Sequence, residues 1–258
     1  MNRRIAVAAC LLVVLSPLAS QGEVWNLLND FSATQNPNGA WAFGWRATAT
    51  DPLVLYTDTS PWQECPPDPN VHVWGYQEES TSLQVSKNAN DQVWSCNGCD
   101  FPANTVWFHP GPTQQSVVRW TAPGDMPLAL VAHFLALDTG SSIVRVYYNG
   151  SESFSATLPN IGATADYALT TTCHAGDIID IAVDAISHTD DSVKLDVVIG
   201  PPVGACCFST GGCLVGTEED CEGVGGGYLG DGTSCDSDPC SPTPAESVTW
   251  GRIKSRFR

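Results

Sequence analysis

The chain has 258 residues, of which 28 are acidic and 11 are basic, so its formal net charge is −17 at pH 7. So strong a negative field argues against nucleic acid and anionic membranes as partners. No segment after residue 22 approaches the roughly 20 apolar residues of a membrane-spanning helix, so the sequence predicts no transmembrane segment in the mature chain.

Residues 1–22 have the features of a cleaved secretory signal. Arg3 and Arg4 precede the apolar run Ile5–Leu15, and Ser20-Gln21-Gly22 offers small residues at a cleavage site. The alternative is a lipoprotein signal acylated at Cys10, although few apolar residues precede that cysteine. Cleavage removes two basic residues and no acidic one, which moves the formal charge from −17 to −19. We expect an exported protein that is extracellular or held at the cell surface.

Residues 23–200 carry short runs of alternating apolar and polar residues, separated by Gly, Pro, Asn and Asp, which is the pattern of an all-β domain. Asn149-Gly150 predicts a tight hairpin turn. Leu128–Leu137 is apolar on both faces, which places it inside a sheet. The fold class expected is an antiparallel two-sheet β-sandwich of the jelly-roll type, with a closed barrel as the alternative. The other predicted strands are Gln115–Thr121, Ser142–Asn149, the segment containing Phe154, Ala156 and Leu158, Gly176–Ile186 and Ser192–Gly200.

Four segments of this region resemble, in the same order, a β-sandwich domain of exported bacterial proteins. They are DFSATQNPNGAWAFGW (30–45), VWFHPG (106–111), VVRWTAPG (117–124) and HAGDIIDIAVD (174–184). That domain is similar in outline to carbohydrate-binding and galactose-binding-like jelly rolls. The resemblance implies the fold and an extracellular setting, and it transfers no catalytic residues to this chain.

Four cysteines lie in the body of the chain: Cys65, Cys96, Cys99 and Cys173. The pair Cys96 and Cys99 has C-x-x-C spacing, but thioredoxin-type redox chemistry needs a βαβ fold, and a zinc site needs further ligands nearby. We therefore expect structural disulfides, with Cys96–Cys99 bridging the Asn-Gly turn and Cys65 joined to Cys173. Four cysteines allow three pairings, and the sequence does not choose among them.

The tryptophans fall into two groups. Trp41, Phe43 and Trp45 share one face of an alternating segment, and core packing is the simpler interpretation for them. Three others lie in polar, turn-rich stretches, where we expect exposed rings. An exposed indole can stack on the C–H face of a pyranose, so these three are the candidate ligand-binding residues. They are Trp62, Trp74 and Trp94.

The histidines show no catalytic or metal-binding pattern. His133 lies in an apolar strand, where we expect a hydrogen-bonded core residue, and His109 precedes Pro110-Gly111, where it would order a turn. No histidine has metalloprotease spacing or lies beside a serine in a nucleophile turn. The neighbouring residues Glu78 and Glu79 would point to opposite faces of an extended segment, so paired carboxylates for glycoside hydrolysis would have to come from separate strands.

Oxygen-rich loops make calcium the candidate ion. They are Asn29-Asp30, Asp190-Asp191 and Asp236-Ser237-Asp238, and no twelve-residue EF-hand loop is present. Turn formation is the alternative role of these residues.

Residues 204–240 form a cysteine-rich segment with the spacing C-C-x5-C-x7-C-x13-C-x4-C. It has few large apolar side chains, so burial alone cannot order it, and we expect a disulfide-stapled module that forms outside the reducing cytosol. It resembles a short CC-x-x-x-G-x-C…GG-x-[YF] repeat appended to exported proteins. The adjacent first two cysteines should bond to different partners. The six cysteines are Cys206, Cys207, Cys213, Cys221, Cys235 and Cys240.

Residues 241–258 comprise a Ser-Pro-Thr-Pro linker and a basic, aromatic tail. The tail resembles the W-G-x-I-K-x-x-[YF]-R ending of many exported proteins of planctomycete-like and related Gram-negative bacteria. The resemblance implies a sorting tail recognised by export or anchoring machinery; a plain basic terminus is the alternative. The matching residues are Trp250, Gly251, Ile253, Lys254, Phe257 and Arg258.

These features predict a secreted, non-catalytic binding or cell-surface protein whose partner is extracellular glycan or matrix. The first alternative is a purely structural surface or matrix component. A polysaccharide hydrolase is the less favoured alternative, because no catalytic residue set is recognisable in the sequence.

Overall fold

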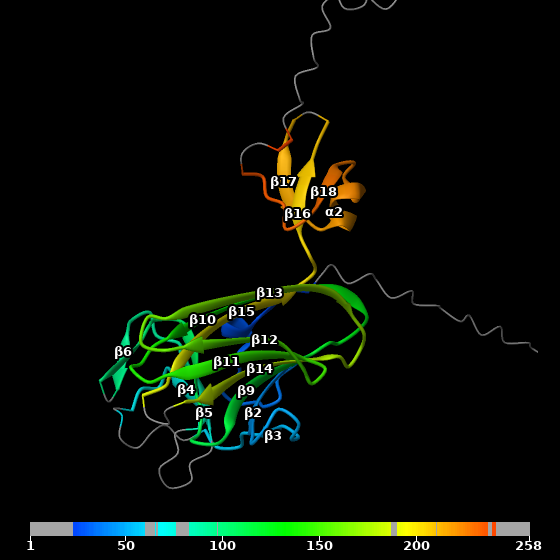
Figure 1. The fold of residues 1–258 in the computed structure, drawn as a ribbon. Helices are drawn as coiled ribbons and strands as arrows, with labels where there is room; N and C mark the ends of the chain where they lie inside the picture. Colours follow the sequence, from blue (N-terminus) through cyan, green and yellow to red (C-terminus); the bar gives the residue numbers. More distant parts are fainter. Residues whose placement is uncertain are drawn as a thin grey trace, which may run out of the picture.

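The computed structural model describes residues 23–59, 65, 67–75, 83–96, 98–186, 190–209, 211–236 and 239–240. They form two stacked antiparallel β-sheets followed by a small disulfide-rich lobe (Figure 1). The predicted fold class is therefore confirmed, and the two separate sheets replace the closed-barrel alternative. The predicted signal sequence, Trp62, the Glu78-Glu79 pair, Asp238 and the sorting tail lie outside the described residues.

The first sheet contains β13, β10, β15, β8, β5 and β4 in spatial order, with β1 paired to β15. The second sheet has the order β12-β11-β14-β9-β2-β3. The strands of the first sheet are β13 (Thr164–Cys173), β10 (Met126–Ala136), β15 (Val193–Gly200), β8 (Thr105–His109), β5 (Gln84–Asn88), β4 (Val71–Gly75) and β1 (Trp25–Asn26). The strands of the second are β12 (Ser151–Leu158), β11 (Ser142–Tyr148), β14 (Ile178–Ala185), β9 (Gln115–Thr121), β2 (Trp41–Arg46) and β3 (Val54–Leu55). A single short helix, α1 (Leu27–Asp30), follows β1 among the described residues of the sandwich.

The predicted strands agree with β9, β10, β11, β12, β14 and β15 to within a few residues. The Asn149-Gly150 turn is confirmed, because both residues have the positive φ angles, 49° and 78°, that the tight hairpin turn between β11 and β12 requires. Strand β10 lies inside its sheet, between β13 and β15, as its apolar sequence predicted.

The main core fills the space between the sheets. The alternation in β2 buries Trp41 and Phe43 completely and packs the partly buried Trp45 against the same core. Trp25 meets Trp120 edge-on, with ring centroids 5.2 Å apart. Aromatic residues therefore supply much of the buried area that stabilises the sandwich.

A short β-hairpin covers part of the outer face of the first sheet. Its strands are β6 (Trp94–Cys96) and β7 (Cys99–Phe101). Phe101 packs on Trp107 of β8, with ring centroids 4.3 Å apart. We call the small core beneath the hairpin the hairpin cluster; its buried members are Cys65, Val71, Cys96, Phe101, Trp107 and Leu137.

The disulfide-rich lobe is a three-stranded sheet with one short helix. Its elements are β16 (Gly204–Cys207), β17 (Cys213–Gly216), α2 (Glu218–Gly223) and β18 (Gly227–Asp231). Thr217 caps the helix, because its hydroxyl accepts a hydrogen bond from the backbone N–H of Asp220 at 3.1 Å.

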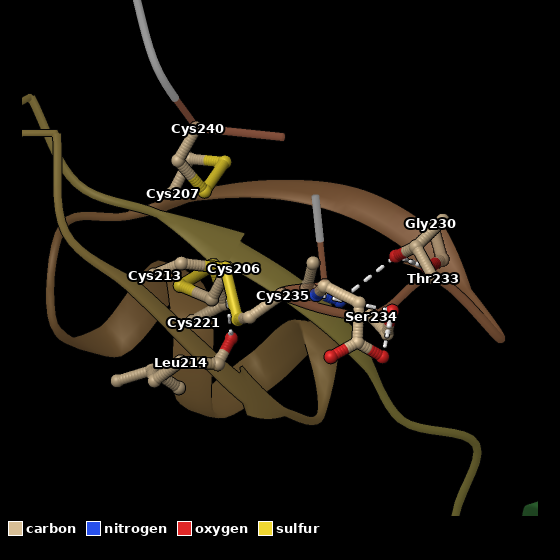
Figure 2. The surroundings of a disulfide bond; sticks show 12 residues. Cys206, Cys207, Cys213, Leu214, Cys221, Gly230, Thr233, Ser234, Cys235 and Cys240 are labelled. Atoms are coloured by element: carbon tan, nitrogen blue, oxygen red, sulfur yellow. Dashed lines mark hydrogen bonds between the residues drawn. A yellow bond between two sulfur atoms is a disulfide. The ribbon is translucent and has the colours of Figure 1, made fainter. Parts of the chain in front are cut away.

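Disulfides, rather than large apolar side chains, hold this lobe together, as the sequence predicted. The bonds are Cys206–Cys221, Cys207–Cys240 and Cys213–Cys235, so the adjacent Cys206 and Cys207 do have different partners (Figure 2). The buried hydrophobic residues of the lobe, among those described, are Ala205 and three of these cysteines. No helix among the described residues is long and apolar enough to cross a membrane.

Candidate ligand-binding site

The connections β8–β9, β10–β11 and β12–β13 all lie at one end of the sandwich, which we call the loop end. Antiparallel pairing fixes this arrangement. Strands β8 and β10 both pair with β15 and both end beside Val193 at its start. Ser142 at the start of β11 pairs with Leu158 at the end of β12. The disulfide-rich lobe follows β15, which ends at the opposite end of the sandwich from the loop end. The hairpin β6–β7 lies far from this lobe (Figure 1).

A groove of about 290 Å³ opens at the loop end, between the hairpin turn and the connections β10–β11 and β12–β13. Its wall is aliphatic: Leu135 and Leu137 lie at the end of β10, and Ile161 is 59% exposed. Two carboxylates, Asp100 and Asp138, face the same space. The remaining lining residues are Gly98, Ala136, Thr139 and Gly162.

Local hydrogen bonds hold both carboxylates in place. Asp100 Oδ1 accepts a 2.6 Å bond from the hydroxyl of Ser95 on the facing strand of the hairpin. Asp138 Oδ1 accepts from the backbone N–H of Thr139 at 2.8 Å, and Oδ2 accepts from the thiol of Cys99 at 2.7 Å. A carboxylate has about four acceptor positions, so both groups can accept further hydrogen bonds from a ligand.

Beside the groove, His109 and Asp191 form a buried pair, with Nε2 and Oδ1 3.2 Å apart. Burial raises the pKa of Asp191 to about 8, and nearby Asp138 and Asp190 raise it further in the same direction. Burial also lowers the pKa of His109. Both shifts favour the uncharged forms, so the pair is a neutral, sealed contact that a ligand in the groove does not reach. His109 thus orders the end of β8, as expected, because its Nδ1–H donates a 2.9 Å hydrogen bond to the carbonyl oxygen of Pro110.

Of the candidate tryptophans, the two that the structure describes, Trp74 and Trp94, form no exposed platform. Trp74 is a correction: it is 6% exposed, and its indole N–H donates a 2.7 Å hydrogen bond to the carbonyl of Ser32. The polar residues around it suggested a loop, but β4 turns its ring into the core. Trp94 is half-buried and packs on Phe101 and Trp107, with centroid distances of 5.5 Å and 6.2 Å.

The pairing of the body cysteines also differs from the expectation. Cys65 is bonded to Cys96, whereas Cys99 and Cys173 carry free thiols. The expected Cys96–Cys99 and Cys65–Cys173 bridges are therefore absent from this structure. Cys173 is fully buried and pairs with Met126 at the start of β10. Cys65 belongs to the hairpin cluster, which lies near the end of that strand.

His133 is a second correction. It lies on the outer face of β10 with 39% of its side chain exposed, and Nδ1 is 2.6 Å from Asp166. The strand is apolar on both faces, but the outer face is open to solvent, as Val131 at 59% exposure shows.

The acidic loops do not gather ligands for calcium among the described residues. Asp30 Oδ2 is occupied by the backbone N–H of Asn26 and the indole N–H of Trp41, at 2.8 Å and 3.1 Å. Asp236 accepts from the hydroxyl of Ser234. Among described residues, the one group of three possible metal-ligand side chains within reach of one ion is Cys207, Cys213 and Cys240, and all three are bonded in disulfides.

A larger cleft of about 910 Å³ lies between the sandwich and the disulfide-rich lobe. Acidic residues dominate its rim, and several already have partners: Asp220 binds the hydroxyl of Thr217, and Asp231 binds that of Tyr228. Trp25 in its wall is 7% exposed. Trp25 is the one aromatic residue among the described residues that line this cleft and it is buried, so we favour the groove at the loop end, where the exposed side chain of Ile161 lies beside two carboxylates.

The sequence interpretation missed Asp100, Asp138 and Ile161. Asp138-Thr139-Gly140 and Asn160-Ile161-Gly162 each follow a predicted strand and carry turn-forming residues. These turn residues indicated two connections between strands. Only the strand order shows that both connections lie at the same end of the sandwich.

No protein-family model matches the chain, and no curated protein matches it. Several solved structures are similar in fold. The tandem CBM51 modules of the family 98 glycoside hydrolase from Streptococcus pneumoniae align with 10% identity and a TM-score of 0.37, over 49% of this chain and 43% of theirs. The chain thus matches less than half of that structure.

Two single modules align over a similar share of this chain. CBM51 from Clostridium perfringens GH95, in complex with methyl-galactose, has 14% identity and a TM-score of 0.32, over 47% of this chain and 90% of that module. The carbohydrate-binding module CBM36, in complex with calcium and xylotriose, has 14% identity and a TM-score of 0.28, over 44% and 96%. These structural neighbours are carbohydrate-binding modules.

Proposed function

We propose that this protein is an extracellular, non-catalytic glycan-binding protein and that the groove at the loop end is its binding site. The observation that carries the proposal is the combination, in one groove, of an exposed aliphatic side chain, Ile161, with the carboxylates of Asp100 and Asp138. A sugar ring has apolar C–H faces, which can pack on Ile161, and hydroxyl groups, which can donate hydrogen bonds to the two carboxylates. Hydrogen bonds from hydroxyls to carboxylates are strong because they are charge-assisted.

The charge of the molecule narrows the class of glycan. The full chain carries a net charge of −17, and both polar groups of the groove are acidic. A uronic acid or a sulfated sugar would therefore be repelled. The expected ligand is a neutral or amino sugar in an oligosaccharide or polysaccharide.

In this proposal the groove carboxylates bind the sugar and do not act as a catalytic acid. A glycosidase acid has a raised pKa and contacts the sugar. Among the described carboxyl groups, Asp191 has a strongly raised pKa, but it is 1% exposed and lies outside the groove lining. The groove carboxylates therefore serve recognition in this proposal.

The disulfide-rich lobe and the tail complete the proposal. Four disulfides suit an oxidising extracellular compartment. We propose that residues 241–258 attach the protein to export or anchoring machinery. If so, deletion of Trp250–Arg258 changes where the protein accumulates, and the sandwich still binds its glycan.

The test is a panel of immobilised neutral, amino and acidic glycans probed with the wild-type chain and with Asp100→Asn. We expect retention on one or more neutral or amino glycans, weakened at least tenfold by Asp100→Asn. Repeating the panel in EDTA tests whether binding uses calcium, the candidate ion of the acidic loops. Retention on no glycan at high protein concentration would contradict the proposal and favour a purely structural role. Release of reducing sugar would contradict the non-catalytic role.

A further inference from the structure

Three cysteines meet at the hairpin, and two of them are bonded. Cys96 and Cys99 lie directly opposite each other in the pairing of β6 with β7, beside the turn that joins the strands. Cys96 is bonded to Cys65, 31 residues earlier in the chain, and Cys99 is a free thiol. Cys65 and Cys96 are buried members of the hairpin cluster, and Cys99 packs against it, so the three side chains lie together beneath the hairpin.

Backbone geometry places Cys99 within bonding range of Cys96. Opposite residues of an antiparallel pair have Cα atoms about 4.5–5.5 Å apart. Disulfides span Cα separations of about 4.4–6.8 Å. A Cys96–Cys99 bond would therefore need side-chain rotation and no displacement of the strands.

We propose that Cys99 is a thiol–disulfide exchange site that can displace Cys65 from Cys96. The thiolate of Cys99 attacks Sγ of Cys96, the Cys65–Cys96 bond breaks, and Cys65 leaves as a thiolate that takes up a proton from water. One disulfide and one thiol exist before and after the step, so no oxidant or reductant is needed.

Asp138 holds the exchange back in the structure. The thiol of Cys99 donates a 2.7 Å hydrogen bond to Asp138 Oδ2, which keeps it protonated and turned towards that carboxylate. Burial, this hydrogen bond and the negative charges of Asp138, Asp190 and Asp100 together raise the pKa of Cys99 to about 12. The nucleophile in disulfide exchange is the thiolate, so attack is slow at neutral pH and faster as the pH rises.

Exchange would loosen the cover over the first sheet. Cys65 ties its segment to the hairpin, and both Cys65 and Cys96 are buried in the hairpin cluster. Among the described residues, three buried polar atoms beneath the hairpin have no hydrogen-bond partner from the protein: Ser86 Oγ, Trp94 Nε1 and Trp107 Nε1.

The second free thiol does not take part. Cys173 is fully buried opposite Met126, at the start of β10, whereas Asp138 follows the end of the same strand. It donates to the carbonyl of Met126 at 3.4 Å. Cys173 therefore provides an internal reference thiol whose state should not change.

The experiment uses the full mature chain without added oxidant or reductant. Wild type, Cys99→Ser and Asp138→Asn are incubated at neutral and at alkaline pH, acid-quenched, alkylated and mapped as non-reduced peptides. The matched control is Asp166→Asn, which removes a carboxylate on β13 that is not among the groups that shift the Cys99 pKa. Near-ultraviolet circular dichroism checks that each sample stays folded.

We expect Cys65–Cys96 at neutral pH and a growing fraction of Cys96–Cys99, with alkylated Cys65, at alkaline pH. Asp138→Asn should raise the exchange rate at least tenfold, Asp166→Asn should match wild type, and Cys99→Ser should keep the Cys65–Cys96 bond at every pH. If wild type shows alkylated Cys99 and an unchanged Cys65–Cys96 bond at alkaline pH, the proposal is wrong, whether or not Asp138→Asn folds. Appearance of a bond to Cys173 would overturn it as well. These readouts do not depend on glycan binding.

Discussion

Arg46 and Asp180 form an ion pair that is sealed from solvent on the outer face of the second sheet. Arg46 Nη1 lies 2.8 Å from Asp180 Oδ2, and the two side chains are 2% and 3% exposed. The guanidinium group also lies over the ring of Tyr147, 4.6 Å from its centroid. Ala49 and Leu53, in the connection from β2 to β3, pack over the neighbouring residues of this face. This part of the outer face is therefore a structural layer and not an open binding surface.

Substitution of Asp180 by Ala should destabilise the sandwich strongly. It leaves the buried guanidinium of Arg46 without its carboxylate and also removes the partner of Arg119, whose Nε lies 2.7 Å from Asp180 Oδ1. Loss of one member of a buried pair costs about 3–5 kcal/mol. Urea unfolding measures the change. Asp184→Ala is the control, because its pair with Arg145 is 25% exposed and should cost less than about 1 kcal/mol. Equal losses for the two variants would contradict this account.

Trp74 should be a stabilising residue with no part in ligand binding. Trp74→Phe removes its 2.7 Å hydrogen bond to Ser32 and keeps most of the ring, so we expect a loss of about 1–3 kcal/mol in the free energy of unfolding. Trp74→Ala should cost about 3–5 kcal/mol because it leaves a cavity in the core. Thermal unfolding measures both. A folded Trp74→Phe variant that loses glycan binding would show that the ring has a role outside the core.

The buried pair of His109 and Asp191 should make stability fall as the pH rises through the neutral range. The pKa of Asp191 is raised from 3.8 to about 8, so between these values the folded state holds a proton that the unfolded state has released. Unfolding is therefore favoured as the pH rises in this window, and the effect levels off above about pH 8. The lowered pKa of His109 acts in the opposite direction. Below pH 6.5, the ordinary pKa of histidine, the unfolded state takes up a proton that the folded state does not, so stability falls as the pH falls.

Asp191→Asn separates the two effects. The variant should lose the decline in urea midpoint between about pH 6 and pH 8 and keep the contribution of His109. Asp166→Asn, on the exposed outer face, is the control. A wild-type midpoint that is constant over this range, and that Asp191→Asn leaves unchanged, would show that Asp191 is ionised in the folded protein.

Mild reduction should unfold the disulfide-rich lobe before the sandwich. The buried residues of the described lobe are chiefly cysteines, whereas the sandwich has an extensive aromatic and aliphatic core between its sheets. Removing native disulfides from a small domain typically costs about 2–5 kcal/mol per bond. Limited proteolysis after reduction should cut within residues 204–240 and leave a folded sandwich fragment. Simultaneous loss of both parts would mean that the lobe stabilises the sandwich directly.

The pattern of apolar residues predicted β9, β10, β11, β12, β14 and β15, because each buries a face against a single core, and it missed β13. It also placed Trp41 and Phe43 correctly. Trp74 was misassigned because polar stretches flank the segment Val71–Gly75, whereas its burial depends on Ser32 and the core, far away in the sequence.

Contacts distant in the sequence explain the other differences. Arg46 and Asp180 are 134 residues apart, so only the strand order brings them together. C-x-x-C spacing suggested a Cys96–Cys99 bond, but in the structure Cys96 is bonded to Cys65, 31 residues earlier in the chain. The groove combines residues from the hairpin and two connections, which no local pattern could assemble.

The most direct test of the central claim replaces two exposed aliphatic residues, one at a time, by serine. It then compares the affinity of each variant for the glycan that the wild-type chain binds. Ile161 lines the groove and Val131 lies on the outer face of β10, and each is 59% exposed, so serine at either position should cost similar stability. Titration calorimetry should show binding weakened at least tenfold by Ile161→Ser and unchanged by Val131→Ser. Equal affinity for Ile161→Ser and wild type, with both proteins folded, would contradict the assignment of glycan binding to this groove.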